Sequence, residues 1–114
     1  MTSLTSVVPF TTKDGSTIHE LHHTALQSLA QATLDPGQAT QRHYHRRSEE
    51  LYFLQSGSGR LRVGDEYRDV RAGECVVIPP GAIHKLTNCG EVPIRLLCCC
   101  APPYTDADTV LTGG

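Results

Sequence analysis

Glycine and proline recur about every 8 to 15 residues along this chain, which leaves room only for short secondary-structure elements. Between them lie short runs in which apolar and polar residues alternate, as in strands with one buried face. No segment sustains the 3.6-residue apolar period of an amphipathic helix. The sequence therefore predicts an all-β sandwich or barrel. We expect its strands at residues 16–21, 28–34, 40–46, 50–56, 60–64, 67–71, 75–78, 83–88 and 93–100.

A chain of 114 residues is expected to form a single domain with its own hydrophobic core. We place the barrel core at about residues 16–100, with an N-terminal arm at 1–15 and a C-terminal tail at 101–114. A barrel closes most of its strand edges, and an exposed edge needs a pairing partner. We therefore expect a homodimer in which the N-terminal strands help to pair the subunits.

The charge and the apolar content of the chain argue against two classes of partner. The net charge of -2 gives no electrostatic reason to expect nucleic acid or an acidic membrane surface. No apolar run approaches the roughly 20 residues of a membrane-spanning helix. The first 15 residues lack the charged and apolar regions of a secretory signal, so we expect a cytoplasmic protein. Its expected partner is a small-molecule substrate or ligand.

The five cysteines are Cys75, Cys89, Cys98, Cys99 and Cys100. Neighbouring residues on a strand face opposite sides, so the consecutive triplet cannot supply three thiolates to one metal ion. The spacing matches neither a zinc ribbon nor a small disulfide scaffold. We interpret these residues as reduced, mostly buried thiols that pack as small hydrophobic groups.

Two histidines one residue apart, His43 and His45, stand in a predicted strand. Residues i and i+2 of a strand project from the same face, so both imidazoles can reach one metal ion. If strands 40–46 and 50–56 form a hairpin, Glu50 lies across from the pair and can supply a third ligand. A solvated surface turn is the alternative interpretation of these residues.

His84 is the only histidine after His45. The Pro-Pro-Gly turn at residues 79–81 allows the chain to reverse sharply before it, and Leu86 shares its strand face. His84 is therefore expected to face an apolar interior. An unpaired polar group there is costly, which favours a metal ion or a hydrogen-bond partner for the imidazole.

The spacing of these residues resembles the two sequence motifs of the cupin family. The first region contains Gly37, His43, His45, Glu50 and Gly57, separated by five, one, four and six residues. The second contains Gly73, Pro79, Gly81, His84 and Asn88, separated by five, one, two and three residues. No position of either motif is missing, and the remaining strand pattern fits the same barrel.

The resemblance implies a double-stranded β-helix, or jelly-roll barrel, typical of small single-domain bacterial cupins. It also implies that His43, His45, Glu50 and His84 bind one metal ion. Glu49 has the opposite parity and is not expected to be a ligand. The ending CCCAPPYTDADT resembles that of small sugar-isomerase-like cupins.

Three imidazoles and one carboxylate suit a divalent transition metal, namely manganese, iron, zinc, nickel or cobalt, and do not choose among them. Tyr52 has the same parity as Glu50 and is the candidate catalytic residue, with core packing as its alternative. Gln41 is a further inward candidate, and Arg47 an anion-binding one. We find no spare inward carboxylate.

These features favour a metal-dependent enzyme acting on a small oxygenated metabolite, such as a sugar isomerase, an epimerase or a lyase. An iron-dependent dioxygenase and a non-catalytic module that binds a small molecule or a metal remain alternatives, because the fold alone does not decide the reaction.

Overall fold

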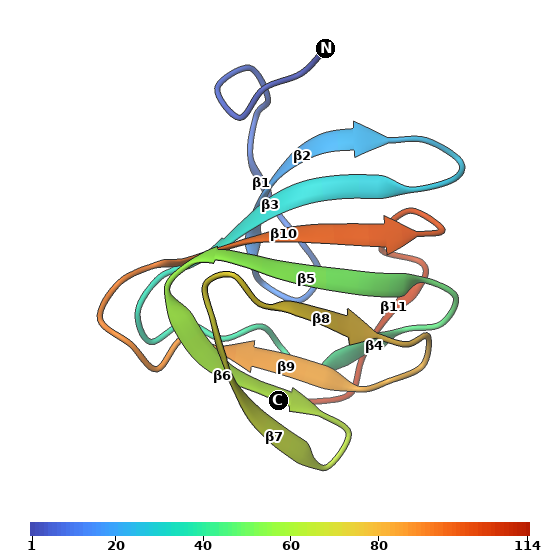
Figure 1. Ribbon diagram of the computed structural model, residues 1–114. Helices are drawn as coiled ribbons and strands as arrows, with labels where there is room; N and C mark the ends of the chain where they lie inside the picture. The colour runs from blue at the N-terminus through green and yellow to red at the C-terminus, as the bar shows by residue number, and fades with distance from the viewer.

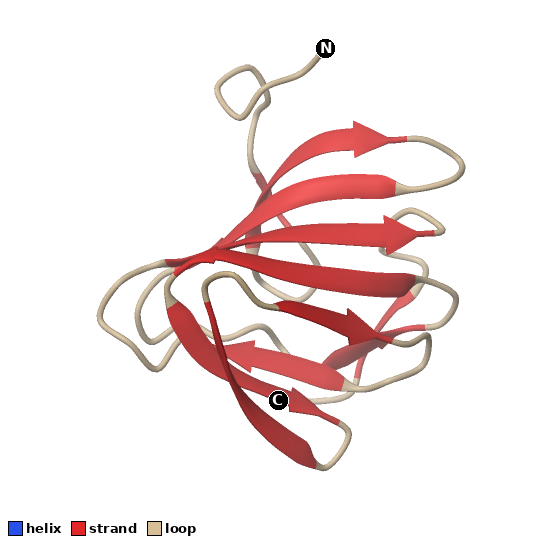
Figure 2. Cartoon of the chain, in the orientation of Figure 1, coloured by secondary structure: helices blue, strands red, loops and turns tan.

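The computed structural model describes all 114 residues and contains only strands, turns and loops (Figure 2). The all-β prediction is confirmed, and each of the predicted strands is present with shifts of a few residues at its ends. The strands are β1 (Phe10–Thr11), β2 (Thr17–His23), β3 (Ser28–Leu34), β4 (His43–His45), β5 (Glu49–Ser56), β6 (Ser58–Val63), β7 (Glu66–Arg71), β8 (Cys75–Ile78), β9 (His84–Thr87), β10 (Ile94–Ala101) and β11 (Thr109–Leu111).

The strands form two antiparallel sheets (Figure 1). The first has the order β1-β2-β3-β10-β5-β8, and the second has the order β11-β4-β9-β6-β7. No helix in the structure has the length and apolar character needed to cross a membrane. The antiparallel strand pairs of the two sheets connect residues far apart in the chain, so distant segments meet in the interior.

The hydrophobic core lies between the two sheets. Strand β3 alternates strictly between buried and half-buried residues, which is the pattern of a strand with one face in the core. Leu54, Leu61 and Ile94 are at most 1% exposed. Burial of each such side chain contributes about 1.5–3 kcal/mol relative to leaving it in water.

The expected hairpin between residues 40–46 and 50–56 is not present. Strand β4 pairs with β9 and β11 in one sheet, whereas β5 pairs with β8 and β10 in the other. The connecting segment crosses between the sheets at Ser48, whose hydroxyl donates to the Pro102 carbonyl at 2.7 Å. Glu50 therefore approaches the histidines from the opposite sheet. Periodicity in the sequence gives the face of each strand but not its pairing partner.

Both ends of the chain contribute strands to the sheets. In the expected arm, β1 pairs with β2; in the expected tail, β11 pairs with β4. The tail is therefore part of the sheet that carries His43 and His45. Strands of two and three residues are too short to show an alternating pattern, so periodicity does not predict them.

Gly57 occupies a motif position that requires glycine for steric reasons. Its φ is +81°, and a Cβ atom there would lie 2.6 Å from the Pro93 carbonyl oxygen. Only glycine adopts this conformation without strain and also avoids the neighbouring backbone. The close approach allows the tight turn from β5 to β6, where the chain passes from one sheet to the other.

Candidate metal centre

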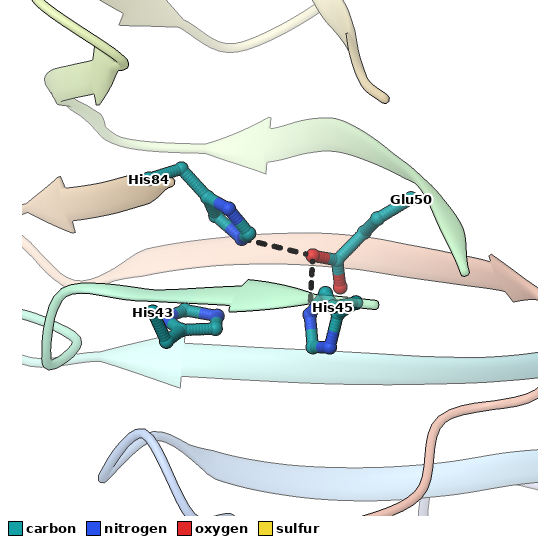
Figure 3. A group of neighbouring side chains, drawn as sticks. All are labelled: His43, His45, Glu50 and His84. Atoms are coloured by element: carbon teal, nitrogen blue, oxygen red, sulfur yellow. Dashed lines mark hydrogen bonds and ion pairs between the residues drawn. The ribbon is translucent and has the colours of Figure 1, made fainter. Parts of the chain in front are cut away.

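Four side chains from both sheets meet inside the barrel (Figure 3). One ligand atom from each of His43, His45, Glu50 and His84 lies within 4.8 Å of the others. His43 on β4 stands directly opposite His84 on β9 in the strand register. All four residues are at most 5% exposed. The set expected from the motif spacing is therefore gathered in one place, although Glu50 arrives across the interior and not from a hairpin.

Hydrogen bonds to the backbone orient two of the imidazoles. The Nδ1 atom of His43 lies 2.6 Å from the Gln41 carbonyl oxygen, and that of His84 lies 2.9 Å from the Ala82 carbonyl oxygen. A carbonyl oxygen can only accept, so each Nδ1 carries the proton and donates it. In the neutral ring Nε2 then keeps its lone pair and points toward the centre of the cluster.

The third imidazole, that of His45, is oriented by a side chain. Its Nδ1 atom lies 3.0 Å from the Thr109 hydroxyl oxygen, and that hydroxyl donates to the Thr105 carbonyl oxygen at 2.9 Å. The hydroxyl proton is therefore engaged, and the oxygen accepts the proton of His45 Nδ1. Partners of this kind fix the orientation and tautomer of metal-binding histidines.

The carboxylate of Glu50 is the negative charge of the cluster. Its Oε1 lies 3.2 Å from Nε2 of both His45 and His84. Without a metal ion, a ring that is also protonated at Nε2 can donate to this oxygen. Burial by itself raises the pKa of Glu50, but these hydrogen bonds and the charges of the two imidazoles outweigh it and hold that pKa well below its ordinary value. For His45 the effects have the opposite sign. Burial lowers the pKa of its imidazole, but the hydrogen bond and the charge of Glu50 outweigh burial, and the pKa of His45 is raised overall.

The residues present fit a divalent metal ion. Nε2 of His43 is buried and has no hydrogen-bond partner, which is costly for a polar atom in the interior. Burial and the neighbouring His84 lower the pKa of His43, so the lone pair of its Nε2 is free at neutral pH. Three such nitrogens and one carboxylate oxygen could hold manganese, iron, zinc, nickel or cobalt, as expected from the sequence.

A fifth polar group, the carboxylate of Asp14, lies beside the cluster. Asp14 is 7% exposed, and its Oδ2 lies 3.3 Å from Nε2 of His43. The expectation that no further carboxylate points inward is therefore wrong. The stretch Lys13-Asp14-Gly15 is typical of a turn, and a turn explains an aspartate without any site. Only the packing of the β1–β2 turn against β4 reveals its position.

Tyr52 is buried, at 3% exposed, and its ring centroid lies 5.9 Å from that of His84. The inward direction expected from parity is confirmed, while its catalytic role stays a prediction. Burial raises the pKa of Tyr52 well above its ordinary value, so the hydroxyl stays protonated.

The expectation that Gln41 points inward is wrong, because Gln41 is exposed and contributes only its backbone carbonyl oxygen, which accepts from His43. Arg47 is also exposed.

The cysteine triplet behaves as its parity predicts. Cys98 and Cys100 line the cavity beside the cluster, while Cys99 lies on the opposite face of β10. The Cys100 thiol donates to Oε2 of Glu50 at 3.4 Å. All five cysteines are free, but Cys75 and Cys89 are exposed, so the expectation of burial holds only for part of the set.

A cavity lined by His45, Glu50, Cys98 and Cys100 lies between the two sheets. Its apolar wall comes largely from β3 and β10, and its polar groups are His45, Asp14, Glu20, Glu50 and several hydroxyls. A concave, mostly apolar cavity with a few converging polar groups is typical of a small-molecule site.

Comparison with known families decides the classification. The model of the Cupin_2 family, the cupin domain, matches residues 30–100. This chain is a cupin. The matched residues include all four members of the cluster, whereas Asp14 and Thr109 lie outside them.

Three known proteins resemble this cupin over most of its length. An uncharacterised protein of Methanocaldococcus jannaschii is 41% identical over 113 residues, which cover 95% of this chain and 90% of the relative. A double-stranded β-helix protein of Klebsiella pneumoniae superposes with a TM-score of 0.81 at 20% identity, covering 100% of this chain and 97% of that one. The nucleoside dehydratase Pac13 of Streptomyces superposes with a TM-score of 0.82 at 16% identity, covering 99% and 90%. The double-stranded β-helix expected from the sequence is thereby confirmed.

Proposed function

We propose that this cupin is a metal-dependent enzyme that removes a proton from a small oxygenated metabolite. A sugar isomerase or an epimerase then returns a proton to the substrate, whereas a lyase expels a leaving group that takes the proton up. The observation that carries the proposal is the position of Asp14. A carboxylate that belongs to no motif stands 3.3 Å from a candidate ligand, in a cavity that is otherwise mostly apolar. A site that only stores a metal has no need of such a group.

His43, His45, Glu50 and His84 would hold the metal ion, which when bound would act as a Lewis acid on a substrate oxygen. The chain supplies the remaining parts. Asp14 Oδ2 is placed to accept a proton. Its other oxygen, Oδ1, is already engaged by the backbone N–H and the hydroxyl of Ser16, at 3.0 and 2.8 Å.

Tyr52 would act as a hydrogen-bond donor, because a hydroxyl with a raised pKa does not release its proton readily at neutral pH. The apolar walls from Ala30, Ala32 and Leu96 exclude water and strengthen the electrostatic interactions in the cavity. Pac13 has the same fold and is an enzyme, which supports the general idea that such a barrel can host catalysis.

Elemental analysis of the full chain, purified without added metal, is the first test. We expect about one divalent transition metal ion per chain. The variant carrying both His43→Ala and His84→Ala is expected to lose it; equal metal content in that variant and the parent contradicts the four-ligand site.

Turnover separates the reaction classes. The manganese-loaded chain, without oxygen, is expected to isomerise or dehydrate a member of a panel of sugars and hydroxy ketones. Oxygen consumption by the iron-loaded chain would favour the dioxygenase alternative. No turnover by any metal-loaded form would favour a binding module.

The cytoplasmic location expected from the sequence remains a prediction.

A further inference from the structure

The cavity beside the candidate metal centre is acidic, and His45, itself a candidate ligand, is its only basic side chain. Its charged lining residues other than histidine are Asp14, Glu20 and Glu50, and neither lysine nor arginine lines it. The other polar atoms come from serine, threonine and tyrosine hydroxyls and from cysteine thiols. A carboxylate or phosphate group on a substrate would therefore meet negative charge, with no lysine or arginine to pair with it.

The charge of Asp14 is fixed in place. Its Oδ1 accepts hydrogen bonds from the Thr12 hydroxyl and from both the N–H and the hydroxyl of Ser16. Oδ2 is left facing Nε2 of His43, a buried nitrogen without a hydrogen-bond partner. The carboxylate cannot turn away to avoid an incoming anion without breaking these three hydrogen bonds.

The basic residues nearest in the chain are directed elsewhere. The Lys13 ammonium donates to the carbonyl oxygens of Asp106 and Thr109, at 3.3 and 2.8 Å. Arg46 and Arg47 are exposed and do not line the cavity. Glu20 lies 3.1 Å from the exposed His23, which offsets part of its charge when that imidazole is protonated. Asp14 is therefore the strongest fixed negative charge facing the cavity besides Glu50.

We propose that this site selects an uncharged, hydroxyl-bearing substrate and excludes carboxylates and phosphates, with Asp14 as the residue that decides. This inference rests on the proposed function, because it needs a metal ion held by the four-residue cluster. A divalent ion with Glu50 leaves a net charge of about +1, and Asp14 brings the site close to neutral. The metal centre then loses most of its attraction for anions, while Asp14 Oδ2 accepts a hydrogen bond from a substrate hydroxyl.

Glycolate and glycolamide test the proposal, because they have nearly the same shape and differ by one negative charge. The full chain is loaded with Co²⁺, and binding of each probe is followed at pH 7.5 by the visible absorption of the metal ion. The variant Asp14→Asn removes the negative charge but keeps the shape of the side chain and its Oδ1 acceptor. We expect this variant to bind glycolate about tenfold more tightly than the parent, and glycolamide no more tightly.

Asp65→Asn is the matched control, because Asp65 is fully exposed in the β6–β7 turn and its substitution removes the same charge far from the cavity. This control variant should leave the dissociation constants of both glycolate and glycolamide unchanged. Glu20→Gln at the cavity rim provides a second variant if Asp14→Asn folds poorly, and a smaller increase in glycolate affinity is expected there. A glycolate affinity of folded Asp14→Asn within twofold of the parent overturns the inference while leaving the proposed function intact. If Asp14→Asn does not fold, the same result for Glu20→Gln overturns it. A parent chain that takes up no Co²⁺ contradicts both.

Discussion

The Thr109 hydroxyl accepts a hydrogen bond from Nδ1 of His45 across 64 residues of sequence, at 3.0 Å. Because the same hydroxyl donates to the Thr105 carbonyl oxygen, its own proton is engaged and it can only accept from the imidazole. A residue in the last strand of the chain thus fixes the tautomer of a candidate metal ligand in β4. Strand β11 belongs to the candidate site as well as to the sheet.

Thr109→Val should weaken metal binding by about 10- to 100-fold, because the substitution keeps the shape of the side chain and removes the acceptor that orients His45. Competition with a chelator for Co²⁺ measures the change. Thr112→Val is the matched control, since Thr112 lies just beyond the same strand and bonds to Arg42 instead. A chelator titration that does not distinguish Thr109→Val from the parent would show that this hydrogen bond has no role in metal binding.

The interaction between Glu50 and His45 should make a pH-dependent contribution to the stability of the metal-free chain. The lowered pKa of Glu50 adds stability above its ordinary value of 4.5, and that stability is lost as the pH falls through the lowered pKa. The raised pKa of His45 adds stability below its ordinary value of 6.5, and that stability is lost as the pH rises through the raised pKa.

The difference in unfolding free energy between the parent and Glu50→Gln should therefore be largest between about pH 4.5 and 6.5 and should shrink on both sides. Urea unfolding in the presence of a chelator, at a series of pH values, measures it. Glu49→Gln, which changes the exposed neighbour, should give a difference that varies little with pH. A Glu50→Gln curve that is equally flat would contradict the coupling.

Tyr52→Phe should separate catalysis from core packing. The ring stays buried in the variant and only the hydroxyl is lost, so we expect the free energy of unfolding to change by less than about 1 kcal/mol. If the hydroxyl donates to the substrate, kcat/KM should fall by about 100-fold with metal content unchanged. Unchanged kcat/KM on a substrate found in the panel would assign Tyr52 to core packing alone.

Gly57→Ala should be much more damaging than Gly64→Ala. Both glycines have positive φ, so both substitutions carry backbone strain of about 1 kcal/mol. A Cβ at position 57 would also collide with the Pro93 carbonyl, whereas a Cβ at position 64 meets nothing within 4 Å. We expect the free energy of unfolding to fall by at least about 2 kcal/mol more at position 57, measured by urea unfolding. Equal losses would mean that the β5–β6 turn relaxes at little cost.

The homodimer expected from the exposed strand edges remains a prediction. Strands β1 and β8 are the edges of the larger sheet, and Phe53 and Val77 are 41% and 55% exposed on its outer face. Light scattering should give a mass of about twice the 12.4 kDa of one chain. A monomer mass across the micromolar range would contradict it.

The sequence by itself determined nine of the eleven strands and the four candidate ligands. Turn residues bounded the strands, and the two-residue period placed His43 and His45 on one face, because side-chain direction along a strand depends only on local geometry. The motif spacing then added Glu50 and His84. Parity also predicted correctly that Tyr52 faces inward and that Cys98 and Cys99 face opposite ways.

The tertiary structure decided which strands are neighbours, and with them the rest of the site. Glu50 reaches the histidines from the opposite sheet, and Asp14 and Thr109 join them from the two ends of the chain. The contact between Thr109 and His45, 64 residues apart, depends on antiparallel pairing of β11 with β4, and no local period encodes such pairing. The identity of the ligands follows from short-range spacing. The groups that orient His45 and set the charge beside His43 follow only from the way the two sheets close on each other.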